Sequence, residues 1–287
     1  ETIAGPPGPA ALPARSAEFG VPLLCPPGRI PGGSFVYRGR AYRFPVNDGA
    51  YHLHGQVREL PWRIVDAGGD SRQGAFLTAE LKFAEEPRLF AHYPHRIALR
   101  LTYRLRGARL SGELAATNEG DDEAPFGFGL HPYFALRGKA RIAAPVALQY
   151  DNAAPGGLIK EKPGFTRLCA ELSAGMPLDR LPADVDHFVF KADGADERIC
   201  RVISEDDSGE LQFQYDGNFP FLVVFKPPWA DAVSLEPWSC ISDSWNTPLA
   251  AEWSGAGGLK PGERRSYRWS WQTGTVAIPE NSRKRRE

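Results

Sequence analysis

An excess of charge of either sign is missing from this 287-residue sequence, and so are long apolar runs. Its 34 basic and 35 acidic side chains nearly cancel, so the composition gives no sign of binding to nucleic acid or to an anionic membrane. No apolar run approaches the roughly 18 residues of a membrane-spanning helix, and the opening stretch lacks the basic and apolar regions of a secretory signal. We therefore expect a soluble, cytoplasmic protein with neither nucleic acid nor a membrane as a partner.

Cysteine is scarce. The four cysteines lie far apart and form no CxxC pair. This spacing argues against a zinc motif or a dense disulfide framework and favours reduced thiols. Two histidine pairs remain as possible metal ligands, His52 with His54 and His92 with His95. His52 and His54 could share a ligand on one face of a strand, but no cysteine or acidic residue is placed as an obvious further ligand. We predict no metal site.

Two common catalytic signatures are also absent. No GxSxG motif occurs, and the acidic stretch Ser204–Glu210 has the composition of a surface turn rather than of a nucleophile elbow. The glycine-rich stretches Gly32–Gly39 and Gly255–Glu263 lack the strand, loop and helix context of a phosphate-binding loop. General acid–base chemistry remains, because it needs only a histidine and a carboxylate on opposite sides of a small substrate.

Long amphipathic helical patterns are missing, and short strand-like runs take their place. Gly33–Val46 contains two such runs joined at Arg-Gly-Arg, as in a hairpin. In His95–Leu105 apolar and polar residues alternate with the period of a half-buried strand, and Ala108–Gly120 follows after a short turn. Similar runs recur about every dozen residues up to Arg265–Thr273. This texture predicts an all-β protein, a large antiparallel β-sandwich in a single domain.

The two ends of the chain differ in composition from its centre. Residues 1–18 are rich in proline, alanine and glycine, so we expect an extended or disordered lead-in. Residues 275–287 include the basic stretch Ser282–Glu287, which we expect to be a solvated tail. The sandwich domain is predicted to span residues 19–274.

Two residues stand out as candidates for acid–base chemistry. His131 lies in the aromatic loop Phe126–Phe134, and Glu236 follows an apolar strand just before Pro237. Each has a structural alternative. A histidine in an apolar run is often a core residue with satisfied ring nitrogens, and an acidic residue where a strand should stop is more often a surface residue. From the pattern alone, the surface position is favoured for Glu236.

Several segments of the chain resemble a known family. Gly129–Phe134, "GLHPYF", resembles the His-Pro-Tyr-Phe signature of the aldose 1-epimerases, the galactose mutarotase-like proteins. Leu23–Gly55 resembles the family's Arg-Ile segment and its Leu-His-Gly motif, Ala91–Leu105 the strand before the signature, and Val233–Trp238 the strand that carries the catalytic glutamate. The four segments agree in order and cover Gly20–Gln272. The resemblance implies the family's large antiparallel β-sandwich and a monosaccharide substrate.

The resemblance also implies catalytic roles. His131 corresponds to the general acid that protonates the ring oxygen, and Glu236 to the general base that takes the anomeric hydroxyl proton. His54 and Arg29 resemble the groups that hold hydroxyls and steady developing charge. A histidine with an ordinary pKa near ~6.5 would be cationic enough to donate at neutral pH, and partial burial would raise the pKa of the glutamate toward the range of an effective base. No metal or organic cofactor is required.

Substrate-binding residues follow from the same resemblance. Asp186 resembles the acidic residue that binds sugar hydroxyls, although Asp184 is close enough to compete. Tyr133 is expected to fix the histidine and to form part of the pocket wall, since aromatic faces suit the C–H faces of a sugar. The protein is expected to be a monomer or a homodimer. Tryptophans that could add to the wall, or belong to the core, are Trp62, Trp229, Trp238 and Trp245.

The sequence departs from the family pattern at two places. Gly28 precedes Arg29 where the family often has asparagine, and Gln56 follows the Leu-His-Gly motif where galactose mutarotases often have a second glycine. A preference for galactose is therefore not implied. Two alternatives stay open: a non-catalytic sugar-binding protein on the same fold, and a hexose-6-phosphate 1-epimerase with phosphate contacts from Arg58, Arg63, Arg72 and Arg96.

Overall fold

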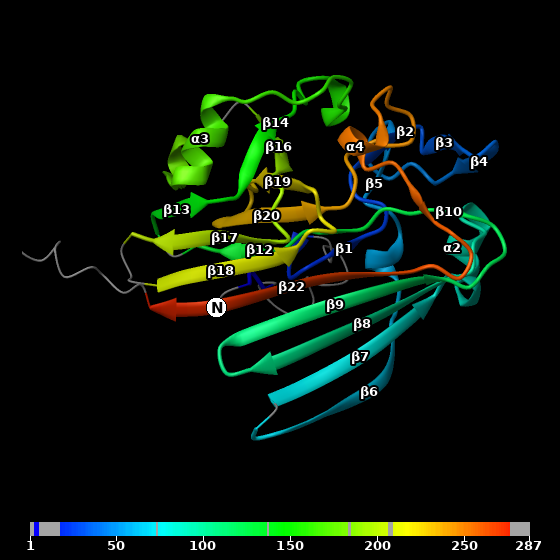
Figure 1. Ribbon diagram of the computed structural model, residues 1–287, viewed down its shortest axis with the longest axis horizontal. Helices are drawn as coiled ribbons and strands as arrows, with labels where there is room; N and C mark the ends of the chain where they lie inside the picture. The colour runs from blue at the N-terminus through cyan, green and yellow to red at the C-terminus, as the bar shows by residue number, and fades with distance from the viewer. Residues whose placement is uncertain are drawn as a thin grey trace, which may run out of the picture.

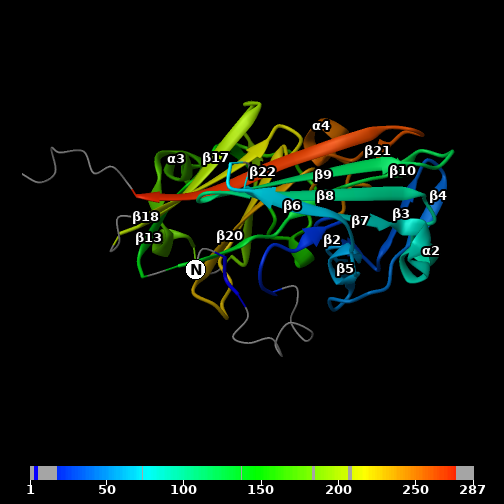
Figure 2. The same cartoon turned by 90° about the horizontal axis from the view of Figure 1, so that it is seen from below.

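The computed structural model describes residues 3–5, 18–72, 74–136, 138–182, 185–205 and 209–275. Its largest element is an antiparallel sheet of nine strands, here called the nine-stranded sheet. In spatial order these strands are β15 (Met176–Pro177), β13 (Ala140–Ala143), β17 (Glu197–Ser204), β18 (Gly209–Asp216), β22 (Arg264–Thr275), β9 (Arg109–Asn118), β8 (Ile97–Arg106), β7 (Gly74–Lys82) and β6 (Arg63–Asp70). Figure 1 shows its long strands β22, β9, β8, β7 and β6 side by side, and Figure 2 shows the same sheet from below.

A second antiparallel sheet of seven strands, here the seven-stranded sheet, packs against the first. Its strands, in order, are β1 (Leu23–Leu24), β11 (Gly129–Leu130), β20 (Ala232–Trp238), β19 (Phe221–Phe225), β16 (His187–Ala192) and β14 (Val146–Gln149), with β12 (Tyr133–Ala135) also paired to β20. In Figure 1, β20, β19 and β16 lie on the same side of the nine-stranded sheet as helix α3 (Arg167–Ala174). The described chain is therefore a β-sandwich.

Short elements surround the two sheets. They are the ribbons β2 (Arg29–Pro31) with β5 (Tyr51–Leu53), β3 (Ser34–Tyr37) with β4 (Arg40–Arg43), and β10 (Ala124–Pro125) with β21 (Gly258–Leu259), the helices α2 (Pro87–His92) and α4 (Ala251–Ser254), and the 3-10 turns η2 (Val57–Glu59), η3 (Phe83–Glu85), η4 (Pro155–Gly157) and η5 (Leu178–Arg180). The helices are short, as the lack of long amphipathic patterns predicted.

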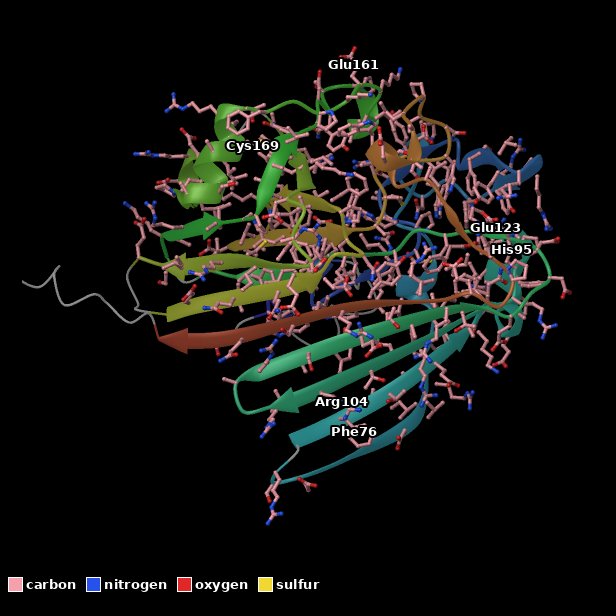
Figure 3. All side chains as sticks on the ribbon, in the orientation of Figure 1. Phe76, His95, Arg104, Glu123, Glu161 and Cys169 are labelled. Atoms are coloured by element: carbon pink, nitrogen blue, oxygen red, sulfur yellow. The ribbon has the colours of Figure 1, made fainter. Side chains whose placement is uncertain are left out.

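The main core fills the space between the sheets. Leu99 and Leu114 of the nine-stranded sheet are fully buried in one cluster with Val233 and Leu235 of β20. The predicted alternation along β8 is confirmed, since Ile97, Leu99 and Leu101 are buried while arginines on the opposite face are exposed. On that exposed face the Arg104 guanidinium packs over the Phe76 ring at 5.2 Å, as Figure 3 shows. Apolar residues thus define one inner face per sheet.

The predicted fold class is confirmed, and so are both predicted hairpins. β3 pairs with β4 across Arg38 and Gly39, and β8 pairs with β9 through ten residues of continuous register. The expected tail over residues 275–287 lies outside the described residues except for Thr275, and most of the expected lead-in lies outside them as well. Of the lead-in, Ile3 forms a bridge with Phe134. The domain limits therefore remain a prediction.

Candidate active site

The candidate site lies on the face of the seven-stranded sheet that is turned away from the core. Side chains alternate along β20, so Ser234, Glu236 and Trp238 face away from the core that buries Val233 and Leu235. Loops cover this face and enclose a cavity of about 290 Å³. The cavity is lined by Glu18, Gly28, Arg29, Leu53, His54, Arg58, His131, Tyr133, Asp186, His187, Val223, Phe225, Trp229, Glu236, Trp238 and Ser242.

Strand register brings His131 and Glu236 together. β11 and β12 both pair with β20, on either side of an interruption at His131 and Pro132. Gly129 lies opposite Trp238, and Tyr133 lies opposite Ser234. The same register places His131 across from Glu236, and their Nε2 and Oε1 atoms are 3.2 Å apart. The two candidates for acid–base chemistry are therefore in direct contact.

The favoured surface position for Glu236 is wrong. β20 continues through Pro237 to Trp238, and Glu236 is only 2% exposed. The proline does not end the strand because β19 still pairs across it, with Leu222 opposite Pro237, while the ladder on the other edge is interrupted. Prolines occur in sheets at such irregular edges, where a backbone N–H is not needed for pairing.

Burial shifts the two pKa values of the pair in opposite directions. Desolvation raises the pKa of Glu236 well above its usual value, and the charge of Asp186 adds to this effect. Desolvation lowers the pKa of His131 to about 3, with a further contribution from the positive charge of Arg58. Burial therefore favours a neutral imidazole beside a protonated carboxyl group, an arrangement in which the pair holds one proton. The expectation of an independently cationic His131 is wrong for the free protein, because the buried imidazole cannot hold a charge without its partner.

Two further side chains orient the His131 ring. The Ser234 hydroxyl lies 2.9 Å from Nδ1, and the Tyr133 hydroxyl lies 3.4 Å from Nε2. The Tyr133 ring also stacks on the imidazole, with 4.5 Å between the ring centroids. Glu236 Oε2 is buried and has no hydrogen-bond partner by distance and angle among the described residues. The neighbouring Ser234 and Trp238 side chains nevertheless interact with the carboxyl group and oppose the rise of its pKa.

His54 reaches the cavity through an unusual backbone conformation. β5 ends at Leu53, and His54 and Gly55 follow with φ angles of 65° and 66°. The Gly28 N–H donates to His54 Nδ1 at 3.1 Å, so the neutral ring carries its proton on Nε2. Burial lowers the pKa of His54 well below its usual value and keeps the ring neutral. Its edge faces the His131 ring at 5.5 Å.

His52 does not share this environment. It is fully buried, stacks on Phe44 and lies with Nδ1 at 2.6 Å from the Pro45 carbonyl oxygen. The two histidines therefore lie on different faces, because the left-handed backbone at His54 breaks the alternation of the strand. Within the part of the chain that the structure describes, no three His, Cys, Asp or Glu side chains are grouped in a way that could hold a metal ion.

Arg29 and Asp186 both line the cavity but come from different parts of the chain. Arg29 begins β2, and its Nε donates to Asp48 at 2.7 Å. Asp186 precedes β16, is largely exposed and accepts from His187 Nδ1 at 3.3 Å. This contact with His187 lowers the pKa of Asp186. The competing candidate, Asp184, lies outside the described residues.

Sequence reasoning missed the lining residue His187 and the His131 partner Ser234, and it left other residues undecided. His187 and Ser234 were not singled out, although each neighbours a candidate, His187 next to Asp186 and Ser234 two residues before Glu236. Their short distance in sequence from a candidate residue was the signal that could have pointed to them. Of the four candidate tryptophans, Trp229 and Trp238 line the cavity, whereas Trp245 stacks on Phe35 in the core. Of the four candidate phosphate-binding arginines, Arg58 is the one that lines it.

Comparison with known proteins places these observations in a family. The family model described as aldose 1-epimerase matches residues 4–272. The uncharacterized proteins YihR and YphB of Escherichia coli strain K12 are each 33% identical to this chain, over 120 and 125 residues. These matches cover 41% and 43% of this chain but only 36% and 39% of the two relatives.

Solved structures share the fold over most of the chain. A galactose mutarotase-like protein from Clostridium acetobutylicum superposes with a TM-score of 0.86 at 20% identity, covering 96% of this chain and 86% of that one. A galactose 1-epimerase from Lactobacillus acidophilus gives 0.76 at 18% identity, with 96% and 85% covered. None of the described helices is long and apolar enough to cross a membrane. With a family model matching nearly its whole length, the chain belongs to the aldose 1-epimerase family.

Proposed function

We propose that the protein is an aldose 1-epimerase-type mutarotase, an isomerase that interconverts the α and β anomers of a free monosaccharide. The observation that carries this proposal is the buried His131–Glu236 pair, with its 3.2 Å contact at the wall of a cavity of about 290 Å³. An acid and a base side by side at the wall of one small cavity can serve ring opening, because the two oxygens that exchange protons, O1 and O5, are bonded to the same carbon.

The proton balance follows from the single proton of the pair. In the reactive arrangement His131 is protonated and Glu236 is ionised. Glu236 takes the proton from the O1 hydroxyl while His131 delivers its proton to the ring oxygen O5. The C1–O5 bond breaks, the C1 carbonyl forms, and rotation about C1–C2 presents its other face. Reclosure runs the two transfers in reverse and restores the pair, so the number of protons on the enzyme is unchanged.

Other lining residues would bind and orient the sugar. We assign to His54 a hydrogen bond from Nε2 to a substrate oxygen, since its Nδ1 is already occupied by Gly28. Arg29 and Asp186 are assigned to hydroxyl groups, and Tyr133 to a wall of the pocket and to the orientation of His131. This chemistry uses side chains alone and calls for no metal or organic cofactor. A cytoplasmic location, a monomeric or homodimeric state and the absence of a nucleic-acid partner belong to the same proposal.

A hexose-6-phosphate 1-epimerase is the second candidate. It is favoured by one observation, the presence of Arg58 in the cavity wall. A non-catalytic sugar-binding protein is less well supported, because a binder gains nothing from burying a carboxyl group against an imidazole. Burying such a pair costs free energy of folding, a cost that an enzyme can recover as catalysis.

Polarimetry tests the proposed function directly. Freshly dissolved α-D-glucose, α-D-galactose and glucose 6-phosphate would be followed with and without the protein, in a buffer that catalyses mutarotation poorly. We expect the approach to anomeric equilibrium to be faster with the protein. If no sugar or sugar phosphate is accelerated, the enzymatic proposal fails and a binding protein becomes the better account.

A further inference from the structure

Arg58 is a buried cation with few partners. Its side chain is 12% exposed. Its Nε has no hydrogen-bond partner among the described residues, and one terminal nitrogen lies 3.5 Å from the Leu53 carbonyl oxygen, at the limit of a hydrogen bond. The nearest carboxylate is that of Glu59, 3.6 Å from Nε, and it is 58% exposed. Solvent screens so exposed a partner, so it compensates little of the buried charge.

An arginine in this state is suited to a ligand. Guanidinium remains charged in proteins, and burial of a charge without a partner is costly. Burial indeed lowers the pKa of Arg58, with opposing contributions from Glu59, Tyr133 and Asp48. Because Arg58 lines the cavity, an anionic group on a bound molecule could supply the missing hydrogen bonds and charge.

The position of Arg58 in the cavity indicates where that anionic group would lie. The turn η2, which carries Arg58, contacts β1, and β1 pairs with β11, the strand that leads into His131. Glu236 lies one strand further on, on β20, and Asp186 precedes β16 beyond it. Arg58 therefore belongs to the His131 side of the cavity. With Glu236 at O1 and His131 at O5, the next position along the sugar ring is C5, which carries the exocyclic C6. A substituent at C6 would point toward Arg58.

We propose that Arg58 binds a carboxylate at C6, so that the substrate is an aldohexuronic acid rather than a neutral hexose. The inference rests on the mutarotase function proposed above and names its substrate class. A guanidinium matches one carboxylate with two parallel hydrogen bonds. A phosphate monoester carries a charge of about −1.5 to −2 at neutral pH. Arg29 lines the same cavity but is paired with Asp48 at 2.7 Å, so Arg58 alone would leave part of that charge unbalanced beside Glu18 and Asp186.

Substrate comparison is the first test. Mutarotation of D-glucuronate, D-galacturonate, D-glucose and glucose 6-phosphate would be measured at one ionic strength. We expect at least one uronate to have a kcat/KM about tenfold or more above that of glucose. The difference should come from a lower KM and not from a higher kcat. In Arg58→Gln the preference for the uronate over glucose should fall by about 10- to 100-fold, as for a lost hydrogen bond to a charged group. Arg58→Lys should retain part of it.

Arg63 supplies a matched control for this substitution. It lies on β6 outside the cavity lining, and it pairs with Glu80 at 3.1 Å. Arg63→Gln removes the same charge and should leave the preference unchanged. If Arg58→Gln lowers kcat/KM equally for glucose and for the uronates, the carboxylate site is overturned, whereas the proposed mutarotase function is not. A preference for glucose 6-phosphate over both uronates would overturn it in favour of the second candidate.

Calorimetric binding separates failure of this inference from failure of the proposed function. Glucuronate and galacturonate would be titrated into Glu236→Gln, in which catalysis should be largely abolished, and into the double variant that also carries Arg58→Gln. Binding to the first and its loss in the second would support the carboxylate site, whatever the polarimetry gives. No measurable binding of either uronate to Glu236→Gln or to the wild-type protein would overturn it.

Discussion

At the scale of single residues, the buried pair of His131 and Glu236 sets the chemistry. Each side chain alone would be neutral at this depth, since burial opposes the charge of both. Their contact of 3.2 Å allows the charged and the neutral arrangements of the one shared proton to interconvert without a change in net charge. A substrate that binds the charged arrangement better than the neutral one would then shift the pair toward it.

Removing either member of the pair should abolish most of the activity. We expect Glu236→Gln and His131→Asn each to lower the catalysed rate by about 10²-fold or more, the usual scale for a general acid or base. Polarimetry on the best substrate provides the measurement. His92→Asn is the control, because His92 lies outside the cavity lining and contacts the Arg43 carbonyl oxygen. Wild-type turnover in folded Glu236→Gln and His131→Asn would contradict the assigned mechanism.

The opposite pKa shifts also predict the pH dependence of catalysis. The active pair holds one proton. A second proton binds to His131 only near its pKa of about 3, and the shared proton leaves only well above the usual pKa of a glutamate. We therefore expect kcat/KM to stay flat between about pH 4 and pH 5, across the ordinary glutamate pKa of ~4.3, and to fall on the alkaline side. A rise in kcat/KM with a midpoint near ~4.3 would show instead that Glu236 titrates as an independent base.

At the scale of elements, the turn after β5 positions one wall of the site. Gly55 has φ of 66°, and a Cβ atom there would overlap the Cys25 carbonyl oxygen. The parallel bridge between Cys25 and Gly55 draws the turn against the chain that leads into β2. His54 N–H donates to the Gly28 carbonyl oxygen, and Gly28 N–H donates to His54 Nδ1. Gly28 thus holds both the His54 backbone and its imidazole Nδ1.

Substitution of Gly55 should therefore reduce catalytic activity in addition to destabilising the turn. We expect Gly55→Ala to reduce kcat/KM by about tenfold or more, since His54 must move to relieve the overlap. Gly32 is the matched control, with φ of 56° and no atom within 4 Å of an added Cβ. Gly32→Ala should cost about 1–2 kcal/mol of stability from the left-handed backbone but keep its activity. Equal activity losses in both variants would contradict the steric explanation.

Elements with a local sequence pattern could be predicted, whereas pairing between strands far apart in the sequence could not. The β8–β9 hairpin was readable because alternation and turn residues are local signals. The pairing of β11 and β12 with β20 was not, because it joins segments far apart in the sequence, and neither the short strands nor Pro237 has a strong strand pattern. Pro237 therefore suggested that Glu236 is exposed at the end of a strand, whereas the pairing register of β20 buries Glu236.

At the scale of the whole molecule, histidine burial extends well beyond the site. Desolvation lowers the pKa values of His52, His54, His95 and His131. Their identities were visible in the sequence, but their environments were not. His95 is 5% exposed and lies 2.7 Å from the Tyr42 hydroxyl. Burial depends on how loops pack onto the sandwich, so His52 and His54, two residues apart, could not be told apart from sequence.

Buried histidines should make the free energy of unfolding fall as the pH is lowered. Below the ordinary pKa of ~6.5 the unfolded chain binds protons that the folded protein does not, so each histidine with a lowered pKa removes up to about 1.4 kcal/mol per pH unit. Glu236 and Asp243, whose pKa is raised to about 6, oppose this trend. The single variant His95→Gln isolates one histidine.

Urea unfolding at pH 7.5 and pH 5.5 measures that contribution. We expect the loss of unfolding free energy between the two pH values to be smaller in His95→Gln than in the wild-type protein, by up to about 1.4 kcal/mol. His52→Gln should behave in the same way, since His52 is fully buried. An unchanged difference in both variants would mean that these histidines titrate alike in the folded and unfolded states.

The interruption between β11 and β12 has a consequence for how such a protein can diversify. Glu236 stands on β20, and His131 lies opposite it between two strands that pair with β20, so their separation is tied to the inter-strand spacing of about 4.8 Å. Arg58, Arg29 and His54 instead come from turns and short ribbons above the sheet. Insertions and substitutions in those connections can change which sugar is accepted while the proton-transfer geometry is inherited unaltered. New specificities can therefore arise without the catalytic step having to be reinvented.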